Sequence, residues 1–207
     1  MNNIENQTQK KLIEVAIELF GANGFKGTSI RDIAKAMGMT ISNIYYYFDN
    51  KYGLLLAVLE YLSMDLMGQL QRVMEMNLDP LERFKLLVTT HLDNIARDKN
   101  KARLFFMDEE ALSPAGNKIN KQLQLSILNI YRNELKNLRA AGYVKYKNIT
   151  ILAFNVIGVI QWHLRWYRPE GKLSIKEVKK EALTFILNGL LWNSSANSKM
   201  KNSKSGC

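Results

Sequence analysis

The sequence predicts an all-α protein of about nine helices, in which a small N-terminal three-helix domain with a helix-turn-helix is followed by a larger helical domain. Three observations lead to this fold class. Apolar residues recur at helical spacing along the chain. Two very short helices are separated by Gly38, and helices so short and close must cross in a helix-turn-helix. The later helices are long and carry many apolar residues.

The first predicted helix covers residues 10–22 and is amphipathic. Its apolar side chains fall on one stripe, as expected for a helix with one buried face. The stripe consists of Leu12, Val15, Ala16, Leu19 and Phe20. Asn23 and Gly24 should end this helix, which would be the third member of the small N-terminal bundle.

The two short helices have clear end signals. Ser29 and Asp32 have the spacing of a capping box at the start of the first one, and Gly38 suits its end. Thr40 then provides an N-cap for the second, which should reach Phe48. The apolar face of the first short helix is formed by Ile30, Ile33, Ala34 and Met37.

Three consecutive tyrosines follow Ile44 in the second short helix. Ile44 and Phe48 are four residues apart and can anchor it to the core. Adjacent helical residues point about 100° apart, so Tyr45 and Tyr46 cannot both be buried on so short a helix. Their rings and hydroxyls suit a DNA groove, where they would meet sugar, thymine methyl and phosphate groups. For Tyr47, aromatic packing at the helix end is the alternative.

The rest of the chain is also predicted to be helical. The expected helices cover residues 50–76, 81–98, 102–112, 115–141, 149–167 and 174–192. The first of them is too long for the small domain alone and should continue into the next. We expect a DNA-binding domain at 1–55, a ligand-binding and dimerisation domain at 56–193, and a disordered polar tail at 194–207.

The last two predicted helices are apolar on nearly every side. Such helices must be covered on more than one side, and a second subunit is a plausible cover. A homodimer through these helices would place two recognition helices in successive major grooves, roughly 34–36 Å apart. Ala153, Gly158 and Gly189 would allow close approach. The alternative is that both are ordinary core helices of a monomer.

Composition and charge limit the function classes. The net charge is +10, yet residues 1–55 hold six Lys and Arg against five Asp and Glu, so most of the surplus lies further on. Cys207 is the only cysteine, which excludes an intrachain disulfide framework. We expect no cofactor, no metal site, no membrane span and no signal region, and hence a cytoplasmic protein.

Residues 27–59, GTSIRDIAKAMGMTISNIYYYFDNKYGLLLAVL, resemble the N-terminal domain of the TetR family of bacterial transcription regulators. The shared marks are G-T-S, I-A-x-x-x-G, I-Y-x-Y-F and N-K-x-x-L-L. The resemblance implies a dimer that binds double-stranded operator DNA. By position, Ser42 and Asn43 would face base edges, and Arg31 would reach a base or a phosphate. The three tyrosines, Tyr45, Tyr46 and Tyr47, would contact backbone and methyl groups, with Thr28, Thr40 and Lys51 on phosphates. Ile41 stands where members often carry a polar or basic residue and offers only apolar contact.

A small-molecule effector site is expected in the larger domain. Its candidate residues are His91, Phe105, Phe106, Leu123, Ile127, Asn155, Trp162, Arg165 and Trp166. The pattern W-x-x-x-W-Y-R-P-x-G-x-L-S, starting at Trp162, resembles TetR-family members that respond to acyl-coenzyme A thioesters. Such a ligand needs an apolar cavity and cations for its phosphates. The alternatives are that this segment is a rigid aromatic turn at the dimer interface, and that His91 is a satisfied core residue.

Two other classes of function agree less well with the sequence. For an enzyme of all-helical fold, the chain has only two His and no glycine-rich phosphate loop or zinc-ligand spacing. A protein that binds nucleic acid without sequence preference would show a salt-dependent but sequence-blind affinity. The sequence therefore favours a dimeric, ligand-responsive transcriptional regulator, with repressor as the first expectation.

Overall fold

The computed structural model describes residues 3–96, 104, 112–167 and 171–191, and within these ranges the chain forms eight helices and no strand. The all-α prediction is confirmed. The helices are α1 (Asn3–Asn23), α2 (Ile30–Met37), α3 (Ile41–Tyr47), α4 (Lys51–Met74), α5 (Pro80–Ala96), α7 (Pro114–Ala140), α8 (Ile149–Trp166) and α9 (Ile175–Leu190). Of the helix expected at 102–112, only positions 104 and 112 are among the described residues. The tail expected at 194–207 lies outside the described residues.

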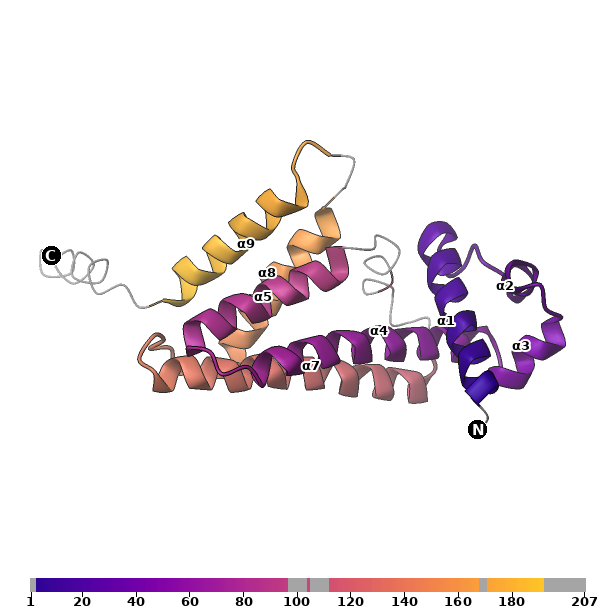
Figure 1. The fold of residues 1–207 in the computed structure, drawn as a ribbon, viewed down its shortest axis with the longest axis horizontal. Helices are drawn as coiled ribbons and strands as arrows, with labels where there is room; N and C mark the ends of the chain where they lie inside the picture. Colours follow the sequence, from indigo (N-terminus) through magenta and orange to yellow (C-terminus); the bar gives the residue numbers. More distant parts are fainter. Residues whose placement is uncertain (1–2, 97–103, 105–111, 168–170, 192–207) are drawn as a thin grey trace, which may run out of the picture.

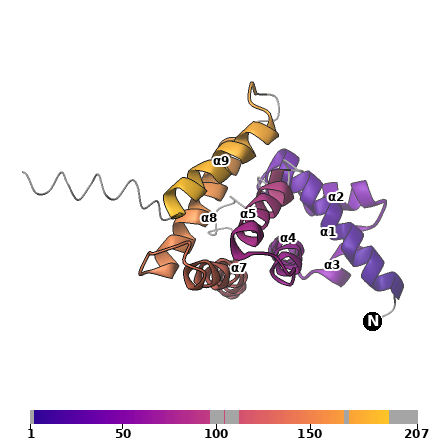
Figure 2. The same ribbon diagram turned by 60° about the vertical axis from the view of Figure 1, so that its left-hand side comes forward.

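The molecule is elongated, with α1, α2 and α3 gathered at one end (Figure 1). From there α4 runs beside α7 along the length of the protein, and the two helices are in contact. The helices α5, α8 and α9 complete the other end, where α8 and α9 pack against each other in both views (Figure 2). The helix-turn-helix thus projects from a larger helical body.

The predicted end signals of the short helices are present. The Ser29 hydroxyl oxygen accepts a hydrogen bond from the backbone N–H of Asp32 at 3.2 Å, and the Asp32 carboxylate accepts one from the backbone N–H of Ser29 at 2.7 Å. The Ser29 hydroxyl also donates a hydrogen bond to the Asp32 carboxylate at 2.6 Å, and this bond, followed by the one from the Ser29 backbone N–H, lowers the pKa of Asp32. Gly38 ends α2 with φ of 64°, a left-handed conformation that favours glycine. The turn between α2 and α3 is therefore fixed by local sequence.

Two apolar cores divide the protein, and α4 contributes to both. The smaller core joins α1, α2 and α3 to the first part of α4, from Leu54 to Leu62, and includes Leu104 and Leu112. The larger core joins the second part of α4, from Leu66 onward, to α5, α7, α8 and α9. As the sequence predicted, the long helix continues from one set of helices into the next.

The length and composition of α4 would also suit a membrane span, which differs from the expectation that no segment is long and apolar enough. Length and composition alone are weak indications, because a core helix passes the same test. The buried leucines and valines of α4 are those that pack in the two protein cores.

Candidate nucleic-acid interface and buried polar site

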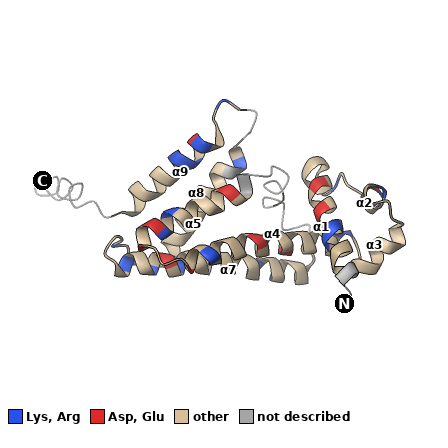
Figure 3. Cartoon of the chain, in the orientation of Figure 1, with Lys and Arg blue, Asp and Glu red and all other residues tan. Residues whose placement is uncertain are grey.

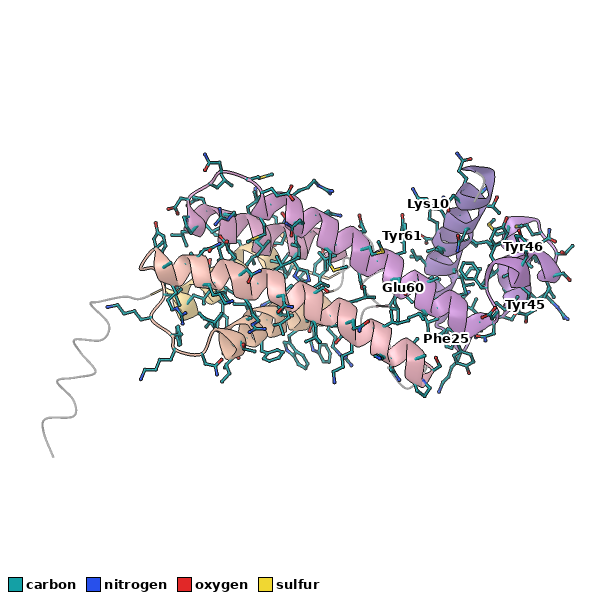
Figure 4. The ribbon with its side chains drawn as sticks, turned by 90° about the horizontal axis from the view of Figure 1, so that it is seen from below. Lys10, Phe25, Tyr45, Tyr46, Glu60 and Tyr61 are labelled. Carbon is teal, nitrogen blue, oxygen red and sulfur yellow. The ribbon has the colours of Figure 1, made fainter. Side chains whose placement is uncertain are left out.

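Four side chains of α3 point away from the protein. Ile44 is fully buried and Phe48 nearly so, which fixes the inner side of the helix. Ser42, Asn43, Tyr45 and Tyr46 are exposed, and the exposed fractions of the two tyrosines are 49% and 71%. Both tyrosines lie at the outer end of the molecule (Figure 4). The structure therefore places these four predicted DNA contacts together on one exposed surface.

Ile41 and Tyr47 stand at the edges of that surface. Both are partly buried and pack against the smaller core. The Tyr47 ring also meets the Tyr46 ring edge-on, with 5.1 Å between centroids. Each of these two side chains therefore has a structural role in holding α3 and offers only part of its surface to a partner.

Polar and cationic residues surround the exposed face of α3. Thr40 is exposed, and its hydroxyl oxygen accepts a hydrogen bond from the backbone N–H of Asn43 at 3.3 Å. Arg31 is exposed in the first turn of α2. Lys51 begins α4, with its Nζ 4.2 Å from the centre of the Phe25 ring, and desolvation lowers the pKa of this amine.

Thr28 is not available to DNA, which corrects the prediction for this residue. Its exposed fraction is 1%, and its hydroxyl lies 3.0 Å from the carbonyl oxygens of both Leu19 and Gly24. A buried hydroxyl is held by such internal partners, because leaving it unpaired costs free energy. Thr28 fixes the end of α1 against the start of α2 instead of contacting phosphate.

In the larger domain, several neutral polar side chains are buried. His91 on α5 is fully buried, and its Nδ1 lies 2.9 Å from the phenol oxygen of Tyr131 on α7. Burial lowers the pKa of His91 to about 4, so the ring is uncharged at neutral pH. Among the described residues of this domain, the other buried neutral polar side chains are Ser63, Asn94 and Asn120.

Some of the predicted ligand residues lie in this region. Ile127 is buried on α7 one turn before Tyr131, in the same core, and Leu123 is partly buried one turn earlier still. Tyr131 was missed by the sequence reading, although it follows Ile127 at the four-residue spacing of one helix face. Phe105 and Phe106 lie outside the described residues.

The remaining ligand candidates lie elsewhere, which corrects the expectation that Asn155 and Trp162 face an internal pocket. Asn155, Trp162, Arg165 and Trp166 are exposed on the outer face of α8. The rings of the two tryptophans pack edge-on with 5.7 Å between centroids, and their exposed fractions are 61% and 60%. In one protomer, these residues do not line the same space as His91.

The outer face of α8 and α9 is notably apolar. Ile151, Phe154 and Phe185 are exposed there together with the two tryptophans. A β-carbon added at Gly158 or Gly189 would meet, apart from the adjacent backbone of its own helix, no atom of the described protomer within 4 Å. Ala153, in contrast, is fully buried in the larger core and does not contribute to this face. Large exposed apolar patches of this kind mark interaction sites.

A projecting helix-turn-helix, joined by one long helix to a body with buried polar groups, defines a ligand-responsive, DNA-binding transcriptional regulator. Two family models match the chain. One, described as "Bacterial regulatory proteins, tetR family", covers residues 12–58, and the other, "Tetracyclin repressor-like, C-terminal domain", covers residues 77–190. The protein belongs to the TetR family of transcriptional regulators, whose members are not enzymes.

Similar proteins agree with this assignment. The HTH-type transcriptional repressor KstR2 of Rhodococcus jostii is 27% identical over 87% of this chain and 89% of its own. A TetR/AcrR-family regulator from Thermobifida fusca is 29% identical, with a TM-score of 0.74 over 87% of this chain and 97% of its own. AibR, solved with isovaleryl coenzyme A and operator DNA, shares the fold at 21% identity, with a TM-score of 0.77 over 86% of this chain and 97% of its own.

Proposed function

We propose that this protein is a cytoplasmic homodimeric repressor, and that a hydrophobic effector of the acyl-coenzyme A type changes its affinity for operator DNA. The observation that carries the proposal is the division of α4 between two cores, one holding α3 and the other containing Tyr131, the hydrogen-bonding partner of the buried His91. A shift of α4 in response to a ligand would move α3 relative to the body.

The proposed DNA surface consists of exposed and half-buried residues on and beside α3. Ser42, Asn43, Tyr45 and Tyr46 would face the groove. Arg31, Thr40 and Lys51 would contact phosphates around it, because cations and hydroxyls at the flanks of a recognition helix set its position on the duplex. Ile41 and Tyr47 would contribute apolar contact at the edges. Thr28 is excluded by its burial.

The proposed dimer interface is the outer face of α8 and α9. Its exposed apolar side chains need a cover, and a glycine within a helix costs about 1 kcal/mol relative to alanine. Gly158 has no neighbour within its own described protomer that would require the absence of a β-carbon. Close approach of a partner helix accounts for it. Asn155, Trp162, Arg165 and Trp166 would then lie in or beside this interface.

The part of the proposed effector that enters the larger core, its acyl chain and thioester, is apolar with a neutral hydrogen-bonding group. His91 and Tyr131 are buried in contact with each other and the His91 ring is uncharged, so a carboxylate placed beside this pair would be costly to desolvate. A thioester carbonyl meets this requirement. AibR, which shares the fold, binds isovaleryl coenzyme A according to its structure, which supports the acyl-coenzyme A class here.

Operator binding is tested by gel shift with DNA from upstream of the protein's own gene. A repressor should prefer its operator over unrelated duplex by a factor on the order of a thousand or more. An affinity that falls steeply with salt and is equal for all sequences would instead identify a non-specific nucleic-acid-binding protein.

The effector is tested by native mass spectrometry of the purified dimer and by thermal unfolding with a panel of compounds. The panel contains acyl-coenzyme A thioesters of several chain lengths, the matching free fatty acids, and coenzyme A alone. We expect at least one thioester to raise the unfolding temperature and to change operator affinity. Stabilisation by the free fatty acids alone would contradict the thioester proposal.

A further inference from the structure

The outward face of α3 carries no charged residue. Between Lys35 and Asp49 the chain has thirteen consecutive uncharged residues, 36–48, and α3 lies entirely within them. Figure 3 shows α3 without any Lys, Arg, Asp or Glu, whereas such residues occur on α1, α2 and the body. Any direct contact of α3 with DNA bases must therefore use neutral groups.

The exposed groups form one continuous surface. At about 100° per residue, Tyr45, Ser42, Tyr46 and Asn43 follow one another around an arc of about 160°. The opposite side of the helix is occupied by Ile44 and Phe48, which are buried. An arc of this width, at the free end of the molecule, is what a recognition helix presents to base edges in the major groove.

We propose that α3 reads A·T base pairs: the Asn43 amide pairs with an adenine, and the rings of Tyr45 and Tyr46 contact thymine methyl groups. This inference rests on the proposed operator binding and specifies its chemistry. An Asn amide is matched to the N6 donor and N7 acceptor of adenine, and apolar surface is matched to the thymine methyl. Guanine and cytosine lack their usual partners, because bidentate Arg or Lys and accepting Glu or Asp are absent from α3.

The cationic side chains nearest to α3 are placed to contact phosphates and not base edges. Arg31 begins α2 and Lys51 begins α4, so both lie outside the recognition helix and flank it. From these positions they contact phosphates, which contributes affinity and register without sequence information. The hydroxyl of Ser42 can donate or accept and does not discriminate between base pairs.

The experiment begins with selection of binding sites from random duplexes by the full-length dimer. The selected half-site is then resynthesised with single-atom changes. 7-Deazaadenine replaces each adenine in turn, which removes the N7 acceptor, and uracil replaces each thymine, which removes the methyl group. We expect one 7-deazaadenine to weaken binding about ten-fold, within the range of one bidentate contact. We expect uracil to weaken binding by a few-fold at the thymines facing the tyrosines.

Two variants assign these effects to residues. Asn43→Ala should bind the intact and the 7-deazaadenine duplexes equally, and Asn43→Arg should prefer guanine at that position. Both keep the cap of α3, because Thr40 accepts from the backbone N–H of residue 43 and not from its side chain. In Tyr45→Ala or Tyr46→Ala, the uracil effect should disappear at one position. Arg31→Ala, the control, should weaken binding to all duplexes by the same factor.

The possible failures are distinguishable. Selection of half-sites whose discriminating positions are G·C, or loss of a guanine preference in Arg31→Ala, would overturn the inference while leaving operator binding intact. If no sequence is enriched although the protein binds DNA, the proposed function itself fails.

Discussion

His91 and Tyr131 are hydrogen-bonded to each other at the centre of the larger core, one from α5 and one from α7. Burial acts on their two pKa values in opposite directions, lowering that of His91 to about 4 and raising that of Tyr131 well above its usual value. In both cases the low-polarity surroundings disfavour the charged form. The pair therefore stays neutral across the physiological pH range.

This neutrality predicts a pH dependence of the free energy of unfolding. In the unfolded chain His91 takes up a proton as pH falls below its ordinary pKa of 6.5, whereas the native ring stays neutral until about pH 4. The free energy of unfolding is thus highest above pH 6.5 and falls as pH decreases toward 4, by roughly 3 kcal/mol in total. Urea unfolding at several pH values measures it. His91→Gln should lack this component, and an unchanged pH profile in that variant would contradict the assignment.

Single residues also show what could and what could not be predicted from the sequence. Ser42, Asn43, Tyr45 and Tyr46 could be placed outside because Ile44 and Phe48 fix the inner side of a short helix. Thr28 could not, because the carbonyl oxygens that hold its hydroxyl belong to α1 and the following turn. Helical periodicity carries no information about such a contact between an irregular segment and the end of a preceding helix.

At the scale of elements, α5 and α7 are joined by a buried ion pair. Arg83 Nε lies 3.0 Å from a carboxylate oxygen of Glu134, whose side chain is fully buried. The other carboxylate oxygen accepts a hydrogen bond from the Asn137 side-chain amide at 2.9 Å. A buried carboxylate is tolerated only with partners of this kind.

Removal of the cation should therefore be costly. Arg83→Ala leaves the Glu134 carboxylate buried without its counter-ion, and we expect a loss of about 3–5 kcal/mol in the free energy of unfolding. The matched control is Lys85→Ala, two residues further along the same helix. Lys85 pairs with Glu82 at 2.7 Å, and this ion pair is largely exposed. That change should cost less than about 1 kcal/mol. Similar losses in the two variants would show that the burial of the Arg83–Glu134 pair does not increase its contribution to the free energy of unfolding.

The outer helices show a second limit of sequence reading. The existence of both helices could be predicted, and so could the N-cap of α9, because Ser174 and Glu177 have the spacing of a capping box and form one. The direction of each face could not, because α8 is apolar on nearly all sides and its periodicity does not distinguish core from interface. For this reason Asn155 and Trp162 were assigned to a pocket, whereas the structure places them on the outer face.

That outer face leads to a prediction about the dimer. Gly158→Leu introduces a bulky side chain where a partner helix is proposed to cross closely, so we expect a shift from dimer to monomer in sedimentation equilibrium and a loss of operator affinity. Asn133→Leu, at an exposed position of α7 outside this face, is the control and should remain dimeric. A dimeric Gly158→Leu protein with unchanged operator affinity would place the interface elsewhere.

At the scale of the whole molecule, α4 is the continuous element between the two cores. Leu62 packs in the smaller core and Leu66 in the larger one, one helical turn apart. A rigid helix transmits a displacement from one core to the other, whereas a softened helix would let each core move alone. Coupling between effector and operator is a free energy shared by both sites, so it can be altered without damage to either.

Met64 offers a direct test, because it lies between those two leucines and its side chain is largely exposed. Met64→Gly removes no core contact but lowers helix propensity at the junction by about 1 kcal/mol relative to alanine. Once the effector is identified, we expect Met64→Gly to bind effector and operator separately with nearly normal affinity, while the effect of one on the other shrinks several-fold. Met64→Ala, which removes the same side chain but keeps the helix stiff, should retain full coupling. Fluorescence anisotropy of labelled operator, with and without effector, measures both. Equal coupling in the two variants would show that α4 does not transmit the signal through this junction.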